Sequence, residues 1–220
     1  MNYKIALIRG DGIGPEVVGE AVKVLEAVGK KFGHSFTYED VLLGGCATDA
    51  VGKSYPDGTA EQCKACNAVL LGAVGGPQWG SDKPAEQRPE TALLAIRKDL
   101  GLYANLRPAA LRPAMADACP LKKETAEKGI DLMMVRELTG GIYFGQREKY
   151  QTEDRGMEAA DRMAYSEQEI ERIGRRAFEL ARLRRKKVSS VDKANVLETS
   201  RLWRSVMHRL AEEDSDVQYE

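Results

Sequence analysis

The sequence predicts an α/β fold, and this prediction rests on strands and helices that alternate along its first half. Tyr3–Ile8 and Ala68–Leu71 are short apolar runs of the kind found in fully buried strands, and Ser35–Leu43 is a more polar strand that a glycine turn follows. Pro15 opens a helix at its favoured first position, with a continuous apolar face that includes Val17 and Val18, and a second helix is predicted over Thr59–Cys66. Such alternation is typical of a largely parallel sheet.

The second half of the chain continues this alternation. Ser166 and Glu169 have the spacing of a capping box, which predicts a helix that runs to about Arg185. Further strands are predicted over Asn105–Pro108, Ile130–Arg136 and Val188–Val191, and the apolar run within Ile130–Arg136 predicts that this strand is buried. Further helices are predicted over Glu90–Leu100 and from Asn195 to about Ala211. We therefore expect two α/β domains, at 1–104 and 105–220, the second with a polar arm at about 146–162.

The composition favours a cytoplasmic globular protein. The 220 residues carry a formal net charge of −1, which provides no overall field to attract nucleic acid or an anionic membrane. No apolar run approaches the ~20 residues that span a bilayer, and charged residues interrupt the start of the chain, so neither a membrane helix nor a signal peptide is expected. The cysteines are then reduced thiols. Cys63 and Cys66 fit a half-buried helix face better than a zinc site, which needs about four ligands.

A glycine-rich turn, Gly10 to Gly14, lies between the first strand and the first helix. Free amides and the helix dipole favour a phosphate group at such a turn. However, the spacing differs from G-x-G-x-x-G, and Pro15 removes one donor. The sequence leaves open both a phosphate cradle and a simple tight turn.

The helix that follows Pro89 carries a mixed stripe of side chains. Residues at i, i+3, i+4 and i+7 share one face of a helix, and here they are Glu90, Leu93, Leu94 and Arg97. A carboxylate, two leucines and a guanidinium suit a ligand with an aliphatic branch and a carboxylate. An ordinary amphipathic helix with long polar side chains at its ends explains the same pattern.

Two of the predicted strands carry an arginine at or near their end. Arg107 lies in Asn-Leu-Arg-Pro and Arg136 in Val-Arg-Glu-Leu, and α/β sheets bind ligands at strand ends. Arginine pairs bidentately with carboxylates. Each arginine alone is more often part of a surface salt bridge, but together with Arg97 the two suggest a site for a di- or tricarboxylate.

Tyr143 and Lys193 are candidates for acid and base catalysis. Tyr143 lies in a glycine-flanked segment, and Lys193 lies in Val-Asp-Lys-Ala-Asn. Both side chains ordinarily titrate near ~10, and mutual proximity or neighbouring cations would bring the pKa of one or both nearer neutrality. A tyrosine and a lysine that face one substrate act as acid and base. Whether the two meet depends on the fold.

Several segments, in order along the whole chain, resemble the 3-isopropylmalate dehydrogenases, a branch of the β-decarboxylating dehydrogenases. The blocks around Tyr143 and Lys193 are typical of the wider family, and the leucine pair before Arg97 points to the isopropylmalate branch. The segments are Gly10-Asp-Gly-Ile-Gly-Pro-Glu16, Val74-Gly-Gly-Pro77, Arg88-Pro-Glu-Thr91, Leu93 to Lys98, Asn105-Leu-Arg-Pro108, Val135 to Gly145, and Ser190 to Glu198.

This resemblance implies a non-Rossmann α/β fold of two domains with a cleft between them. It also implies a homodimer in which each cleft borrows residues from the partner. The implied reaction is the oxidative decarboxylation of 3-isopropylmalate to 4-methyl-2-oxopentanoate in leucine biosynthesis, with NAD as the oxidant and Mg²⁺ or Mn²⁺ as the metal.

The roles of individual residues are carried over by motif. Tyr143 would protonate the enol after decarboxylation, and Lys193, contributed to the neighbouring cleft, would assist deprotonation of the hydroxyl group. NAD would contact Glu90 and the loop from Gly76, with Asn195 near the nicotinamide. The remaining residues would hold the substrate, its carboxylates by Arg97, Arg107 and Arg136 and its isopropyl group by Leu93 and Leu94.

Family members continue well beyond this chain, so the resemblance implies a fold truncated at its C-terminus. The aspartates that bind the metal in the family would lie beyond Glu220, and we expect the 220 residues alone to be inactive because a lost Lewis acid costs several kcal/mol. An isocitrate, homoisocitrate or tartrate dehydrogenase is an alternative, although burying a third carboxylate against Leu93 and Leu94 is costly. A truncated, non-catalytic binding subunit is another alternative.

Overall fold

The computed structural model describes residues 1–220, with the exception of the side chain of Pro113. The chain divides into two compact units, Met1–Gly101 and Leu102–Glu220. The sequence places the boundary slightly later, between residues 104 and 105. Each unit is described by itself below.

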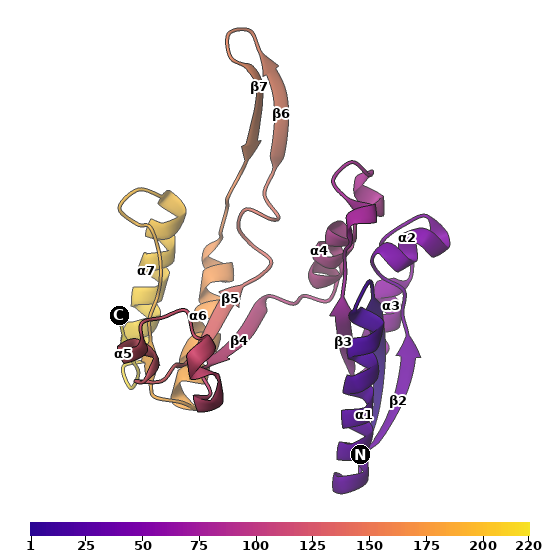
Figure 1. Ribbon diagram of the computed structural model, residues 1–220. Helices are drawn as coiled ribbons and strands as arrows, with labels where there is room; N and C mark the ends of the chain where they lie inside the picture. The colour runs from indigo at the N-terminus through magenta and orange to yellow at the C-terminus, as the bar shows by residue number, and fades with distance from the viewer. The chain divides into compact units, whose positions relative to one another are not determined.

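The first unit contains a three-stranded parallel sheet in the order β2-β1-β3, with helices between and after its strands. Figure 1 shows α1 beside the three strands. The elements in chain order are β1 (Asn2–Gly10), α1 (Gly14–Phe32), β2 (Ser35–Asp40), α2 (Gly45–Val51), α3 (Thr59–Lys64), β3 (Ala68–Ala73), two 3₁₀ turns η1 (Pro77–Trp79) and η2 (Ala85–Gln87), and α4 (Pro89–Asp99).

The central strand β1 is covered on both faces of the sheet. Successive residues of a strand point to opposite faces, and β1 is apolar on both. Leu7 packs with Val18 of α1 in one apolar cluster. Ile8 packs with Ile96 of α4 in another. These two clusters explain why a predicted run of consecutive apolar residues forms a strand here.

Three expectations for the first unit are wrong in detail. Ala68–Leu71 is only partly buried, because β3 is an edge strand of this sheet. The apolar face predicted for α1 is only partly covered, since Val18 is buried whereas Val17 is 50% exposed. The glycine turn predicted after the second strand instead starts a short helix, α2.

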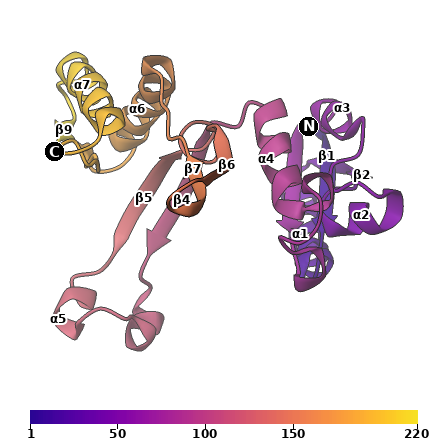
Figure 2. The ribbon, with the colours of Figure 1, turned by 90° about the horizontal axis from the view of Figure 1, so that it is seen from above.

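The second unit is built from two antiparallel strand pairs, two long helices and one short parallel pair. Figure 2 shows α6 and α7 side by side. The elements in chain order are β4 (Ala104–Ala110), a 3₁₀ turn η3 (Pro113–Ala118), α5 (Lys123–Ala126), β5 (Asp131–Glu137), β6 (Arg147–Thr152), β7 (Gly156–Asp161), α6 (Glu167–Arg182), β8 (Lys187–Val188), α7 (Glu198–Glu213) and β9 (Gln218–Tyr219).

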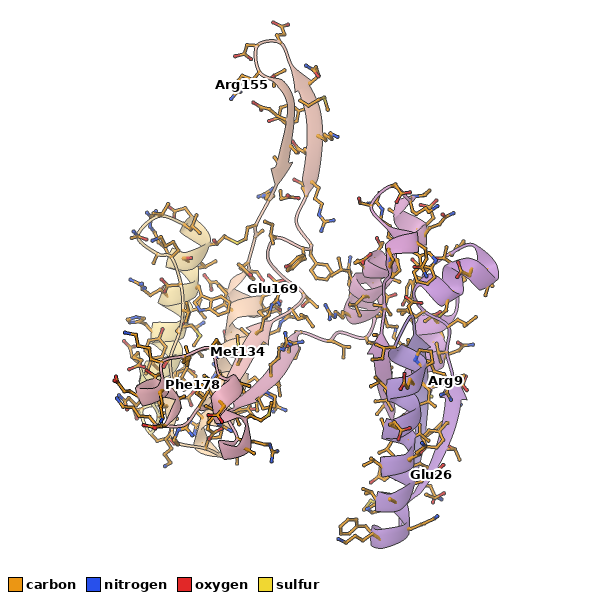
Figure 3. All side chains as sticks on the ribbon, viewed as in Figure 1. Arg9, Glu26, Met134, Arg155, Glu169 and Phe178 are labelled. Atoms are coloured by element: carbon orange, nitrogen blue, oxygen red, sulfur yellow. The ribbon has the colours of Figure 1, made fainter. Side chains whose placement is uncertain are left out.

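The apolar core of this unit lies between α6 and α7. Phe178 of α6, labelled in Figure 3, and Leu210 of α7 are both completely buried in it. Gly174 lets the helices approach closely, because a Cβ at this position would lie 2.5 Å from Cδ1 of Leu210. The predicted capping box at Ser166 and Glu169 is confirmed, although the helix ends at Arg182 rather than at about Arg185.

The strand β5 is not the buried strand that its apolar run predicts. Its outer residues Leu132 and Met134 are 45% and 56% exposed, and Figure 3 shows the position of Met134. The cause is that α6 packs against β5 while the opposite face of the β4–β5 pair is open in this structure. The run of apolar residues therefore predicts correctly that a strand forms here, but it does not predict whether both faces of the strand are buried.

The polar segment predicted to form an arm is a two-stranded hairpin of β6 and β7. Most of its side chains are exposed, and Arg155, labelled in Figure 3, lies in the turn that joins the strands. Each strand has one partner strand among the described residues. An isolated hairpin of this kind is only marginally stable in water.

Candidate active site

The glycine turn after β1 is a tight backbone approach rather than a phosphate cradle. Gly10 has a φ of +72°, and a Cβ at this position would lie only 1.9 Å from the carbonyl oxygen of Ala73. The amide of Asp11 donates to the same oxygen at 2.6 Å, and the amide of Gly14 donates to the carbonyl oxygen of Asp11 at 2.8 Å. Because protein oxygens already accept from these two amides, the structure favours the tight-turn interpretation.

The carboxylate of Asp11 organises the loops around this turn. It is buried and accepts hydrogen bonds from the amides of Gly45 at 2.8 Å, Cys46 at 2.7 Å and Gly75 at 2.7 Å. It therefore joins the end of β1 to the start of α2 and to the loop after β3. The sequence analysis did not single out Asp11. The available signal was a carboxylate inside a glycine turn that follows a buried strand.

The long loop between β3 and α4 is anchored to its own unit. Trp79 is buried, its Nε1 donates to Asp49 at 3.0 Å, and Gly45 leaves room for its ring, since a Cβ there would lie 2.2 Å from the indole. The hydroxyl of Ser54 donates to carbonyl oxygens at the end of the loop, with both distances 2.9 Å. The loop that precedes α4 is therefore an ordered scaffold that contains two 3₁₀ turns.

The predicted stripe on α4 lies next to this loop. The Glu90 carboxylate is exposed and close to the glycine pair, because a Cβ on Gly75 would be 3.2 Å from its Oε1. Gly76 follows directly in the same loop. Leu94 and Arg97 are half-buried, and Leu93 packs against the core cluster that contains Ile96. The structure thus brings Glu90 and the loop together and gives Leu93 a packing role.

In the second unit, the structure brings two predicted arginines and the predicted acid together. Arg136 pairs with Asn105 and Arg107 pairs with Met134 across the antiparallel ladder, so both arginines are on the same face of β4–β5 as diagonal neighbours. Both are exposed. The guanidinium carbon of Arg136 lies 5.6 Å from the ring centroid of Tyr143, which is 53% exposed.

Asn105 adds a polar atom to this group that the sequence analysis missed. Its Oδ1 is buried and has no hydrogen-bond partner among the described residues. It stands opposite Arg136 in the ladder. A buried acceptor without a partner is costly, and a bound ligand with a hydroxyl group would satisfy it.

The turn between Arg136 and Tyr143 is held by the buried carboxylate of Glu137. This carboxylate accepts from the amides of Thr139 at 2.9 Å and Gly140 at 2.6 Å, and from Arg172 of α6 at 2.6 Å. Tyr165 packs over the same turn, and burial followed by the charge of Glu137 raises the pKa of its phenol. Glu137 is the third residue that the sequence analysis did not find.

Lys193 and Asn195 lie exposed in the loop that connects β8 to α7. Among the described residues, no hydrogen bond or ring contact joins Lys193 to Tyr143. The structure of this chain therefore does not bring the predicted acid and base together.

The described residues offer no group of three or more His, Cys, Asp or Glu side chains that could hold a metal ion. Cys63 and Cys66 are free thiols on α3 and just after it. Burial raises the pKa of the Cys63 thiol, which makes it a poor nucleophile. Among the helices of the described chain, none has the length and apolar character that crossing a membrane requires.

Comparison with known proteins agrees with the motifs along the chain. The isocitrate/isopropylmalate dehydrogenase family model matches residues 4–220. The 3-isopropylmalate dehydrogenase of Nitratidesulfovibrio vulgaris is 53% identical over 99% of this chain, and that of Moorella thermoacetica is 56% identical over 99%. These alignments cover 61% and 60% of the two relatives, so the chain spans about 60% of their length.

Solved structures share the fold. The isocitrate dehydrogenase of Methylococcus capsulatus superposes with a TM-score of 0.79 and 32% identity, over 99% of this chain and 59% of that protein. A β-decarboxylating dehydrogenase of Thermococcus kodakarensis superposes with a TM-score of 0.70 and 32% identity, over 99% of this chain and 57% of that protein. The chain therefore belongs to the isocitrate/isopropylmalate dehydrogenase family.

Proposed function

We propose that the complete protein oxidises and decarboxylates 3-isopropylmalate to 4-methyl-2-oxopentanoate in leucine biosynthesis. The observation that carries the proposal is the group formed by Arg107, Arg136 and Tyr143, in which two guanidinium groups and a phenol lie on one part of the second unit. The relatives that share more than half of the chain's residues are named for this substrate.

The arginines hold the carboxylates of the substrate. Arg107 and Arg136 are diagonal neighbours on one face of the strand pair, and each guanidinium presents a planar fork that matches a carboxylate. The family resemblance alone assigns Arg97 on α4 as a third cation for the substrate, and Leu93 and Leu94 of the same helix as contacts of the isopropyl group. The buried Oδ1 of Asn105, which has no hydrogen-bond partner among the described residues, is proposed to accept a hydrogen bond from the hydroxyl group of the substrate.

The proton transfers are assigned to Lys193 and Tyr143. Lys193, contributed to the cleft of the partner subunit, assists removal of the hydroxyl proton while the carbon is oxidised to a ketone. Carbon dioxide then leaves, and the electron pair of the broken bond forms an enolate. Tyr143 donates a proton to the carbon that lost carbon dioxide, which gives the product. General acid and base steps of this kind contribute about 10²- to 10⁴-fold each.

The residues on α4 and its preceding loop fit the dinucleotide. The carboxylate of Glu90 beside the glycine pair is an acceptor for sugar hydroxyl groups, and Gly76 carries no side chain of its own, in a loop where Gln78 and Trp79 lie close to it. Asn195 is proposed to contact the nicotinamide amide. NAD, when bound, accepts the hydride from the carbon that carries the hydroxyl group.

The described residues do not form a metal site, so the proposal contains no step through a metal. Mg²⁺ or Mn²⁺ bound by aspartates after Glu220 stays a prediction from the family resemblance. A homodimer is also proposed, with the β6–β7 hairpin as its arm, because a hairpin with two open edges gains stability from a further strand. A cytoplasmic location is part of the same proposal.

The test is NAD reduction by the complete open reading frame that encodes this chain. The purified protein is assayed with 3-isopropylmalate and Mg²⁺, and the expected result is turnover that disappears when the metal is chelated. A protein made of residues 1–220 alone is expected to show none, and turnover by that protein would contradict the metal prediction.

Isocitrate, homoisocitrate and tartrate are the alternative substrates. We expect kcat/KM to favour 3-isopropylmalate, because a third carboxylate near Leu94 loses its hydration without gaining a partner. A preference for isocitrate would overturn the substrate assignment but not the reaction class. A non-catalytic binding subunit is the remaining alternative, and substrate binding without any turnover by the complete protein would favour it.

A further inference from the structure

The backbone around Lys193 is fixed by side chains and amides that follow it in sequence. The amide of Lys193 donates to the hydroxyl of Ser200 at 3.0 Å. Its carbonyl oxygen accepts from the amides of Val196 at 3.1 Å and Leu197 at 3.0 Å. Both backbone polar groups of Lys193 are therefore engaged, while its side chain is exposed.

Asp192 and Arg204 form a bidentate ion pair in this loop. The Asp192 carboxylate is 7% exposed and accepts from Nε of Arg204 at 2.9 Å and from Nη2 at 2.7 Å. The same carboxylate accepts from the amide of Ala194 at 2.9 Å, and Nε of Arg201 donates to the carbonyl oxygen of Ala194 at 3.1 Å. A bidentate arginine pair fixes direction as well as distance.

We propose that Asp192 and Arg204 act as a positioning pair that directs Lys193 toward the substrate. This inference rests on the function proposed above. A lysine side chain has four rotatable methylene groups, so its amine reaches a defined point only when the backbone from which it starts is held. The pair supplies this restraint from α7, and neither residue needs to touch the substrate.

The first experiment separates positioning from folding in the complete protein. We expect Arg204→Gln to lower kcat about 10- to 100-fold with little change in KM for 3-isopropylmalate, since small misplacements of a catalytic group have costs of this size. Arg204→Lys keeps the charge but loses the fork, and its kcat should lie between those of Arg204→Gln and the unsubstituted protein. The matched control is Arg176→Gln, which removes an exposed arginine of α6 from its ion pair with Glu179; kcat should stay unchanged.

The second experiment asks whether the pair acts through Lys193. Lys193→Met is combined with Arg204→Gln, and residual rates are compared in a double-mutant cycle. If Arg204 works by placing Lys193, its substitution costs nothing further once the amine is gone. An equal fold loss in both backgrounds would show a general structural role and would overturn the proposal.

Amide hydrogen exchange provides a readout that does not need activity. Arg204→Gln should speed exchange at Lys193 and Ala194, while amides inside α6 keep their protection. Unchanged exchange rates at the amides of Lys193 and Ala194 would contradict the proposal even if kcat fell. If the unsubstituted protein shows no turnover with any of the substrates, the function proposed above fails instead, and faster loop exchange would leave the pair with a structural role only.

Discussion

Arg172 donates to the buried carboxylate of Glu137 at 2.6 Å, and this ion pair connects α6 to the end of strand β5. The same guanidinium donates to the hydroxyl of Thr139 at 2.5 Å and lies 4.9 Å from the ring centroid of Tyr103. Because Arg136 precedes Glu137 and Tyr143 follows its turn, the ion pair fixes the segment that carries the proposed arginine and acid.

Glu137→Gln is expected to destabilise the second unit by about 2 kcal/mol, because the substitution removes a charged acceptor from several donors that stay in place. The free energy of unfolding is measured by urea denaturation. Glu179→Gln, which breaks an exposed pair with Arg176, serves as the control and should change stability by less than about 0.5 kcal/mol. Equal effects of the two substitutions on the free energy of unfolding would contradict a stabilising role for the ion pair between Arg172 and Glu137.

Asp11→Asn is expected to destabilise the first unit by about 2 kcal/mol, since an amide nitrogen would replace one oxygen that accepts backbone amides. It should also loosen the loop after β3, seen as faster hydrogen exchange at Gly75. Asp57→Asn removes a carboxylate that is 93% exposed and is the matched control. Slow exchange at Gly75 in Asp11→Asn would show that other contacts hold this loop.

Tyr143→Phe is expected to lower kcat of the complete protein about 100-fold or more while KM and stability change little. The ring keeps its place beside Arg136, and only the hydroxyl group that donates the proton is lost. Steady-state kinetics with 3-isopropylmalate measure both constants. A rise in KM with an unchanged kcat would mean that Tyr143 binds the substrate rather than protonating it.

The carboxyl group of Asp192 is expected to titrate at lower pH than an ordinary aspartate, first because Arg204 donates to it and then because the Ala194 amide does. A depressed folded-state pKa contributes stability above the unfolded value of about 3.9, and this contribution is lost as pH falls through the folded-state pKa. Carboxyl-carbon NMR follows the titration. In Arg204→Gln the midpoint should move upward, and an unmoved midpoint would remove Arg204 as its cause.

Local sequence signals predicted the elements well where the deciding contacts are close in sequence. Pro15 lies in the first turn of α1, and the reciprocal bonds of Ser166 and Glu169 span three residues. The proposed shared site of Arg107 and Arg136 was argued from strand ends, but Arg107 lies in the middle of β4. The antiparallel register that puts both arginines on one face was not visible in the sequence.

The features that the sequence analysis missed depend on distant partners. Asp11 gains its role from Gly75, 64 residues away, and Glu137 from Arg172, 35 residues away. A carboxylate in a turn looks the same whether it faces water or buried amides. The burial of β5 was wrong for a related reason, since an apolar run does not report how many faces its neighbours cover.

The hairpin of β6 and β7 presents two rims of main-chain donors and acceptors. A strand that pairs with such an edge forms hydrogen bonds to the main chain rather than to particular side chains. For the proposed homodimer, amino-acid replacements on the flat surfaces of the hairpin are therefore expected to leave this pairing largely intact. A proline on either strand removes a main-chain amide donor. Replacement by proline is therefore the change expected to weaken this pairing most.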